Sequence, residues 1–122
     1  MQMNKQKIYV GIEDEQAEFD RFIDVWHRAS RGEDVKPEVH LNFDDFGLLI
    51  SLLTPKRLEL LKALRATGPI SVRALSKHLG RDYKNVHVDC SELERVDLIG
   101  RNEDGLLIAP WDVIEAQFQL VA

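Results

Sequence analysis

The segment NVHVDCSELERVDLI, residues 85–99, holds the only cysteine of the chain, three residues after a histidine and one after an aspartate. Such a cluster could be a metal site, a thiol nucleophile with its base, or part of a surface that binds another molecule. A metal site needs three or four convergent ligands, and the chain has no C-x-x-C or H-E-x-x-H spacing to gather its histidines. The histidines are His27, His40, His78 and His87. We therefore expect neither a metal nor another cofactor.

A helix over residues 82–97 would divide this segment into two faces. At 100° per residue, Val86, Cys90 and Leu93 fall on one arc, with apolar character throughout. That arc predicts a core-facing stripe, and a buried thiol lacks the exposure and the lowered pKa that a nucleophile needs. The favoured interpretation of Cys90 is a structural one, because free cysteine is often buried.

The opposite face of this helix carries side chains of the types that contact DNA. Lys84 and Arg95 suit phosphates or guanine edges, and Asn85 is of the type that pairs with adenine. The remaining members are His87 and Ser91, which donate or accept hydrogen bonds, and Val88, which can contact a thymine methyl group. The alternative is a solvated helix face without a binding role. An outward valine among polar neighbours favours the binding hypothesis.

Period-two alternation predicts three strands, over residues 7–13, 38–43 and 114–120. Between the first two, Phe19, Phe22, Ile23 and Trp26 fall at i, i+3, i+4 and i+7, which predicts a helix over residues 14–30 that Gly32 closes. We expect this helix to cover a small sheet made of the three strands, with Trp26 in the core. Either the first or the last strand could instead present an edge to another subunit.

Capping residues in the middle of the chain mark where the predicted helices begin and end. Asp44 and Asp45 can cap a helix that runs to about Leu53, and Thr54-Pro55 begins another that ends near Gly68. Ser71 can cap the short helix VRALSKHL, which Gly80 terminates, and LIGR and LLIA around NEDG predict a β-hairpin.

This order of elements is that of a winged helix-turn-helix. The expected fold class is α+β, with a winged helix-turn-helix core and a small additional sheet formed by the N-terminal strand-helix-strand and the C-terminal strand. The expected divisions are residues 1–53 for dimerisation or partner binding, 54–109 for DNA binding, and 110–122 as a strand that joins the N-terminal part.

Charge is distributed unevenly along the 122 residues, whose formal net charge is −5. Residues 55–101 contain ten Lys or Arg and six Asp or Glu, net +4, and the remainder contains six basic and fifteen acidic residues, net −9. The basic middle is compatible with a polyanionic partner. Since no window is apolar enough to span a bilayer and MQMNKQK lacks a signal-peptide core, we expect a cytoplasmic protein without a membrane partner.

The pattern V-x-x-x-L-x-x-L-x-x-x-G-L-I, with Val86 first and Leu98-Ile99 last, resembles the end of the recognition helix in MarR-like and ArsR-like winged-helix regulators. This chain departs from it at Cys90, in place of leucine, and at Asp97, in place of glycine. Residues 53–99 as a whole are similar to a family of small prokaryotic predicted transcriptional regulators with an L-T-P-x-R lead and an L-G-R-D-x-K-x-V-H-x-D motif. Here the second motif runs from Leu79 to Asp89.

The resemblance implies a regulator that represses its own operon, and members of the family are often thought to act as antitoxins. Carried over residue by residue, it adds Arg81 and Tyr83 to the DNA-facing group. Basic residues before and after the helix, including Lys56 and Arg57, support the same surface. The complete predicted DNA-binding set is Arg73, Lys77, Arg81, Tyr83, Lys84, Asn85, His87, Val88, Ser91, Arg95 and Arg101.

Three function classes can be weighed on these grounds. A dimeric regulator that binds a pseudo-palindromic double-stranded operator is favoured, because a single recognition helix contacts few base pairs. The alternative is an antitoxin whose acidic ends mask a basic toxin. An enzyme is disfavoured, because the chain has no Gly-rich phosphate loop, nucleophile elbow or metal-ligand spacing. Glu103 and Asp104 in the hairpin turn predict that the wing adds little to DNA affinity.

Overall fold

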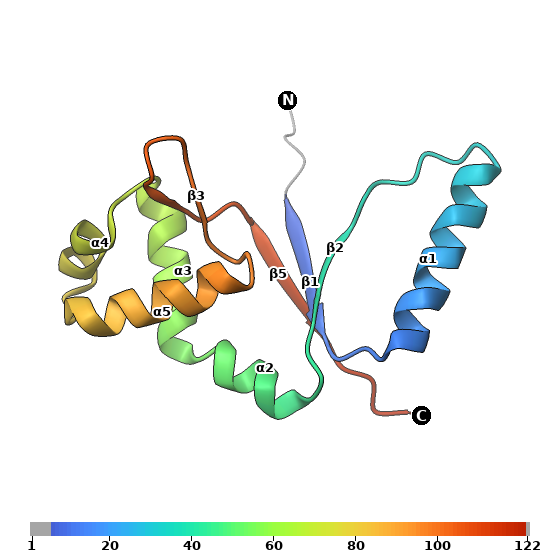
Figure 1. The fold of residues 1–122 in the computed structure, drawn as a ribbon, viewed down its shortest axis with the longest axis horizontal. Coiled ribbons are helices and arrows are strands. Elements are labelled where there is room, and N and C mark those ends of the chain that lie inside the picture. The colour runs from blue at the N-terminus through green and yellow to red at the C-terminus, as the bar shows by residue number, and fades with distance from the viewer. Residues whose placement is uncertain (1–5, 122) are drawn as a thin grey trace. The chain divides into compact units, whose positions relative to one another are not determined.

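A computed structural model describes residues 6–121, which form a mixed α+β structure (Figure 1). In chain order the elements are β1 (Lys7–Gly11), α1 (Glu15–Ser30), β2 (Val39–Asn42), α2 (Phe46–Leu52), α3 (Pro55–Thr67), α4 (Val72–Leu79), α5 (Tyr83–Arg95), β3 (Gly100–Arg101), β4 (Leu107–Ile108) and β5 (Val113–Gln117). The chain divides into two compact units. The first contains Gln6 and residues 50–112, and the second contains residues 7–49 and 113–121. Every helix in the described part of the chain is too short or too polar to cross a membrane.

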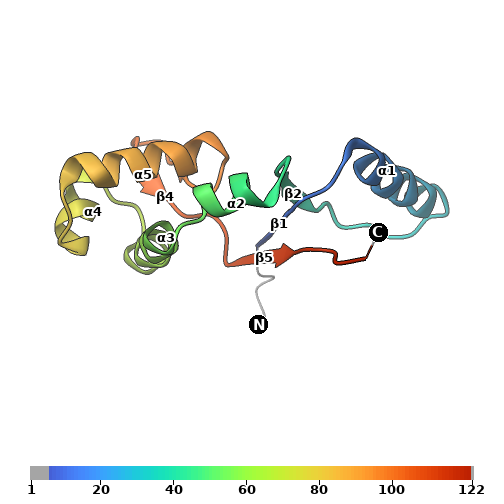
Figure 2. The ribbon, with the colours of Figure 1, turned by 90° about the horizontal axis from the view of Figure 1, so that it is seen from below.

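Helices α3, α4 and α5 form the body of the first unit (Figures 1 and 2). Its core consists of fully buried apolar side chains from all three helices and the hairpin, among them Leu60, Leu64, Leu75, Leu93 and Leu107. The predicted helix starts and the predicted glycine cap are confirmed. The side chains of Thr54 and Ser71 accept hydrogen bonds from the third residue of α3 and of α4, and Gly80 ends α4 in the left-handed conformation.

The predicted hairpin is also confirmed. β3 and β4 pair antiparallel, and Leu107 exchanges both backbone hydrogen bonds with Ile70, at 2.8 and 3.2 Å. The Asn102 side chain accepts hydrogen bonds from the backbone of Asp104 and Leu106, and Gly105 has a φ of 77°. These contacts hold the hairpin turn against the body of the unit.

Asp97 stands where the regulator pattern has glycine, and the backbone shows why glycine suits that position. Its φ of 64° lies in the left-handed region, where a Cβ atom is unfavourable. The turn lets the Leu98 amide donate to the Leu93 carbonyl and brings Leu98 and Ile99 into the core. The indole of Trp111 donates to the Asp97 carbonyl at 3.0 Å.

The three predicted strands form one sheet in the second unit, in the order β2-β1-β5. Both pairings are parallel, and Ile8 and Val10 of β1 are buried. Since β1 lies in the middle, the prediction that it could offer an edge to another subunit is wrong; β2 and β5 are the edges. The last strand is shorter than predicted, because Phe118 and Leu120 lie beyond it and are exposed.

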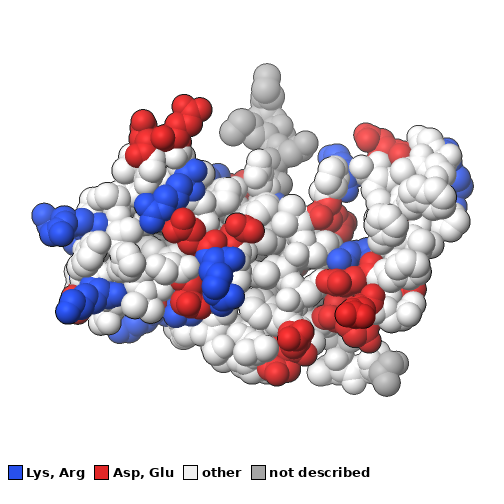
Figure 3. Space-filling model, viewed as in Figure 1, with Lys and Arg blue, Asp and Glu red and all other residues white. Residues whose placement is uncertain are grey.

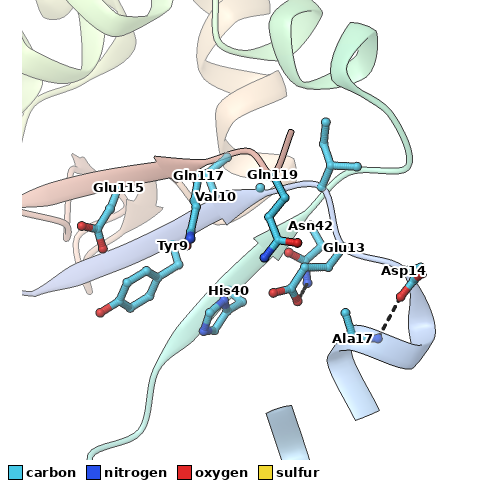
Figure 4. Close-up of a pocket in the computed structure, with 12 residues that line it drawn as sticks. Tyr9, Val10, Glu13, Asp14, Ala17, His40, Asn42, Glu115, Gln117 and Gln119 are labelled. Atoms are coloured by element: carbon cyan, nitrogen blue, oxygen red, sulfur yellow. Dashed lines mark hydrogen bonds between the residues drawn. The ribbon is translucent and has the colours of Figure 1, made fainter. Parts of the chain in front are cut away.

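Helix α1 forms as predicted, but it does not cover the sheet with its apolar stripe. None of its residues is buried, and Phe19, Phe22 and Trp26 are each more than half exposed. The prediction that Trp26 belongs to the core is therefore wrong. The sheet face that carries Tyr9 and His40 is polar and offers this stripe little apolar surface (Figure 4).

Candidate nucleic-acid interface

Helix α5 has one buried face and one exposed face. Val86, Cys90 and Leu93 are at most 1% exposed and anchor the helix in the core of the first unit. The other face carries the predicted groove-facing residues, all of which are exposed: Lys84, Asn85, His87, Val88, Ser91 and Arg95. Val88 is 55% exposed, so an apolar side chain stands in solvent between polar neighbours. The helical period placed these residues correctly from the sequence.

Two arginines hold α5 in position through one carboxylate. Asp89 is largely buried, and its two oxygens accept from Arg57 Nε at 3.1 Å and from Arg81 Nη2 at 2.7 Å. Arg57 also donates to the carbonyls of Ser51 and Leu52. The cluster therefore joins the end of α2, the start of α3 and the turn before α5 to the middle of α5.

The position of this cluster changes the predicted role of two basic residues. The guanidinium groups of Arg57 and Arg81 lie against Asp89 rather than in solvent, and Nη1 of Arg81 is buried. Both residues therefore position α5, although Arg81 was predicted to face DNA and Arg57 to support that surface. Asp89 was not among the predicted functional residues. Two sequence signals could have indicated it: Asp89 lies on the boundary between the two faces of α5, and it is the last residue of the L-G-R-D-x-K-x-V-H-x-D motif.

An aromatic side chain connects α4 to α5 at the exposed surface. The Arg73 guanidinium lies 5.2 Å from the centre of the Tyr83 ring, a cation–π arrangement, and the His87 ring lies 5.9 Å from the same ring. Tyr83 is 40% exposed, so it packs between the helices and still reaches the surface. The first turn of α5 is thus fixed next to the exposed side of α4.

The cations of this surface differ in how far they are already neutralised. Arg95 pairs with Glu92 at 3.0 Å, and Arg101 pairs with Glu94 at 3.2 Å and also donates to the Gly105 carbonyl. Arg73, Lys77 and Lys84 form no ion pair with any residue in the described part of the chain.

The unpaired positive charge therefore lies around α4 and the start of α5. Figure 3 shows blue side chains on the side of the molecule where these two helices lie, and red ones at the tip of the hairpin. The red residues at the hairpin turn are Glu103 and Asp104.

The environment of Cys90 agrees with a structural thiol. Burial and, to a smaller extent, the neighbouring Asp89 carboxylate raise the pKa of the Cys90 thiol from 9.0 to about 11, so the thiol is protonated at neutral pH. Among residues 6–121, no three His, Cys, Asp or Glu side chains come close enough together to hold a metal ion. The predicted core position of Cys90 is thereby confirmed.

The second unit has a separate polar hollow of about 220 Å³ on one face of its sheet (Figure 4). Tyr9 and His40 stack there with ring centres 4.9 Å apart, and Asn42 donates to Glu13 at 3.3 Å and to Glu18 at 2.6 Å. Glu13 also pairs with Arg21. The Asn42 amide and the Glu13 carboxylate therefore have partners within the same unit.

A comparison with protein-family models shows the family to which the chain belongs. The model of the HVO_A0114 family matches residues 52–116, just over half of the chain, from the end of α2 through α3, α4, α5 and the hairpin to β5. The protein is thus an α+β protein whose matched region includes the whole candidate interface. It belongs to the HVO_A0114 family. No curated protein and no solved structure matches the chain.

Proposed function

We propose that the protein is a transcriptional regulator that binds double-stranded DNA through a winged helix-turn-helix. In this proposal α4 and α5 are the helix-turn-helix, α5 is the recognition helix and the β3–β4 hairpin is the wing. The observation that carries the proposal is the exposed face of α5, where side chains able to contact bases lie beside unpaired cations while the opposite face is anchored in the core.

The dimensions and residue types of α5 suit the major groove. Its 13 residues correspond to a length of about 20 Å, and the groove of B-DNA, about 12 Å wide, admits one helix. Recognition helices place their N-terminal residues on base edges. Lys84, Asn85 and Val88 occupy that half of α5, with the free charges of Arg73 and Lys77 next to them for phosphates.

The rest of the predicted surface contributes less in this proposal. Arg95 and Arg101 must first leave Glu92 and Glu94, which reduces the gain from any phosphate contact. The acids at the hairpin turn, Glu103 and Asp104, repel the backbone of DNA. Affinity should therefore depend on the α4–α5 side of the surface rather than on the hairpin.

A dimer is part of the proposal, because one recognition helix contacts few base pairs. Two copies would bind half-sites of a pseudo-palindromic operator about 10 bp apart, or a multiple of that spacing. The resemblance to small prokaryotic regulators supports a repressor of the protein's own operon.

Substitution of Lys84 tests the proposal. We expect Lys84→Ala to weaken binding to operator DNA about tenfold and to reduce the slope of log K against log salt concentration by about one unit, because one phosphate or guanine contact is lost. Fluorescence anisotropy on a labelled duplex measures both quantities. Lys36→Ala, which removes an exposed lysine from the second unit, is the matched control and should change neither. Equal affinity for all three proteins would exclude α5 from the interface.

An antitoxin is the second candidate function, and the charge of the second unit favours it. That unit contains five Lys or Arg and twelve Asp or Glu, net −7, and so complements a basic protein. Coexpression with a small basic protein encoded beside it should give a stable complex if the protein is an antitoxin. Recovery of the protein without that partner would argue for the regulator alone.

A further inference from the structure

The apolar stripe of α1 is an exposed surface that the proposed DNA-binding function does not use. Phe19, Phe22 and Trp26 are 57%, 63% and 60% exposed, and Ile23 beside them is half-buried. Aromatic side chains gathered on one helix face are costly to leave in water and usually mark an interface. A 16-residue helix of about 24 Å is long enough to present such a stripe to another helix.

We propose that this stripe pairs with the same stripe of a second copy of the chain, with the two α1 helices antiparallel about a two-fold axis between Phe22 and Ile23. This inference deepens the dimeric part of the proposed function by naming the interface. It is tested on the protein without DNA, so its failure and the failure of DNA binding are distinguishable.

The order of residues along α1 fits a second copy as the occupant. An interface between identical copies must be self-complementary, so that residue i of one copy meets residue j of the other and j meets i. With the two-fold axis between residues 22 and 23, residue i of one α1 helix lies level with residue 45 − i of the other. Phe22 then meets Ile23 and Phe19 meets Trp26, so apolar side chains meet apolar side chains.

The charged residues beside the stripe change along the helix from acidic to basic. At 100° per residue Glu18 and His27 flank the stripe, and the axis places them at the same height in the pair. Arg21 and Asp24 lie on the opposite side of α1, where Arg21 pairs with Glu13 and Asp24 lies 3.7 Å from Arg28. The proposed dimer therefore leaves these ion pairs intact.

Charge also decides between the two helix directions. α1 is acidic in its first turn, with Glu15 and Glu18, and basic in its last, with His27 and Arg28. A parallel pair would bring acid to acid and base to base, whereas an antiparallel pair brings the acidic end of each helix to the basic end of the other. The helix macrodipoles favour the antiparallel direction as well.

Sedimentation velocity of the full chain from about 1 μM to about 1 mM covers the affinities expected of a small interface. The wild-type protein should form dimers within this range. Phe22→Glu should remain monomeric up to the highest concentration, with an unchanged circular dichroism spectrum because Phe22 contributes little to the core. Leu120→Glu puts the same charge on an apolar side chain that is 99% exposed outside α1, and it should dimerise like the wild type.

Engineered cysteines test the direction of the pair. Glu15 and Ser30 are both exposed and meet each other in the proposed register. An equimolar mixture of Glu15→Cys and Ser30→Cys should therefore give crosslinked dimers with a short bifunctional thiol reagent, whereas either variant alone should not. Cys90 adds no background, since it is buried.

Three results would overturn the proposal. They are a wild-type protein that stays monomeric at every concentration, a Phe22→Glu variant that still dimerises, and crosslinking of either cysteine variant by itself. The first would leave α1 for a different protein partner, the second would move the dimer interface elsewhere, and the third would mean a parallel pair.

Discussion

Cys90 is the residue whose surroundings most change its chemistry. Burial in the core of the first unit, together with the neighbouring Asp89 carboxylate, raises its pKa from 9.0 to about 11, so the folded protein keeps the thiol proton between those two pH values while the unfolded chain loses it. The folded state therefore binds more protons in that range, and the free energy of unfolding falls as pH rises from about 9 to about 11. The full effect is on the order of 3 kcal/mol.

Urea denaturation at pH 8, 9, 10 and 11 measures this fall, and Cys90→Ala is the control that lacks the titrating thiol. The difference in unfolding free energy between the two proteins should narrow as pH rises. A thiol reagent at pH 8 should modify native Cys90 no faster than the protein unfolds. Rapid modification of the native protein would show that the thiol is accessible.

The positive φ of Asp97 strains the backbone, and substitution by glycine should relieve that strain. A residue with a side chain in the left-handed region is less stable there than glycine, so we expect Asp97→Gly to raise the free energy of unfolding by about 0.5–1 kcal/mol. Thermal or urea denaturation measures the change. Asp104→Gly is the matched control, because Asp104 does not have a positive φ, and it should be neutral or destabilising. Equal effects of the two substitutions would contradict the explanation.

Individual side chains could be predicted from the sequence where helical period decides between two faces. Cys90 and Val88 were placed on opposite sides of α5 in this way. The period does not show which buried acid meets which base, so the partnership of Asp89 with Arg57 and Arg81 could not be predicted, because Arg57 lies 32 residues away from Asp89 in the chain.

At the scale of elements, the cluster of Asp89, Arg57 and Arg81 fixes the position of α5 relative to α2 and α3. Asp89→Asn removes the charge that two largely buried guanidinium groups share, and we expect it to lower the free energy of unfolding by about 3 kcal/mol. Glu92→Gln breaks the more exposed pair with Arg95 on the same helix and should cost less than about 1 kcal/mol. Urea denaturation of both variants gives the comparison. Similar losses would show that the cluster adds nothing to an ordinary surface pair.

Elements with their own capping residues were the most predictable part of the fold. Thr54, Ser71 and Gly80 mark helix ends by local hydrogen bonds and backbone geometry, which depend on neighbouring residues alone. The place of α1 was mispredicted, because an apolar stripe shows that a helix face will be buried but does not show by what. The same apolar stripe is expected on a helix that packs against another chain and on one that packs against its own sheet.

At the scale of the whole molecule, charge divides between the two units. The first unit contains ten Lys or Arg and nine Asp or Glu, net +1, whereas the second is net −7. The proposed function expects such a division, because the unit proposed to bind DNA should be the less acidic of the two. Net charge of the whole chain conceals it, and position along the sequence was enough to predict it.

Binding to an operator is the most direct test of this account. Fluorescence anisotropy should be measured on duplex DNA from the region upstream of the protein's own gene, against scrambled competitor, at two salt concentrations. The account predicts binding that resists the competitor, weakens as salt rises and is lost in a Lys77→Ala, Lys84→Ala double variant. Binding no tighter than to scrambled DNA, or undiminished in the double variant, would contradict it.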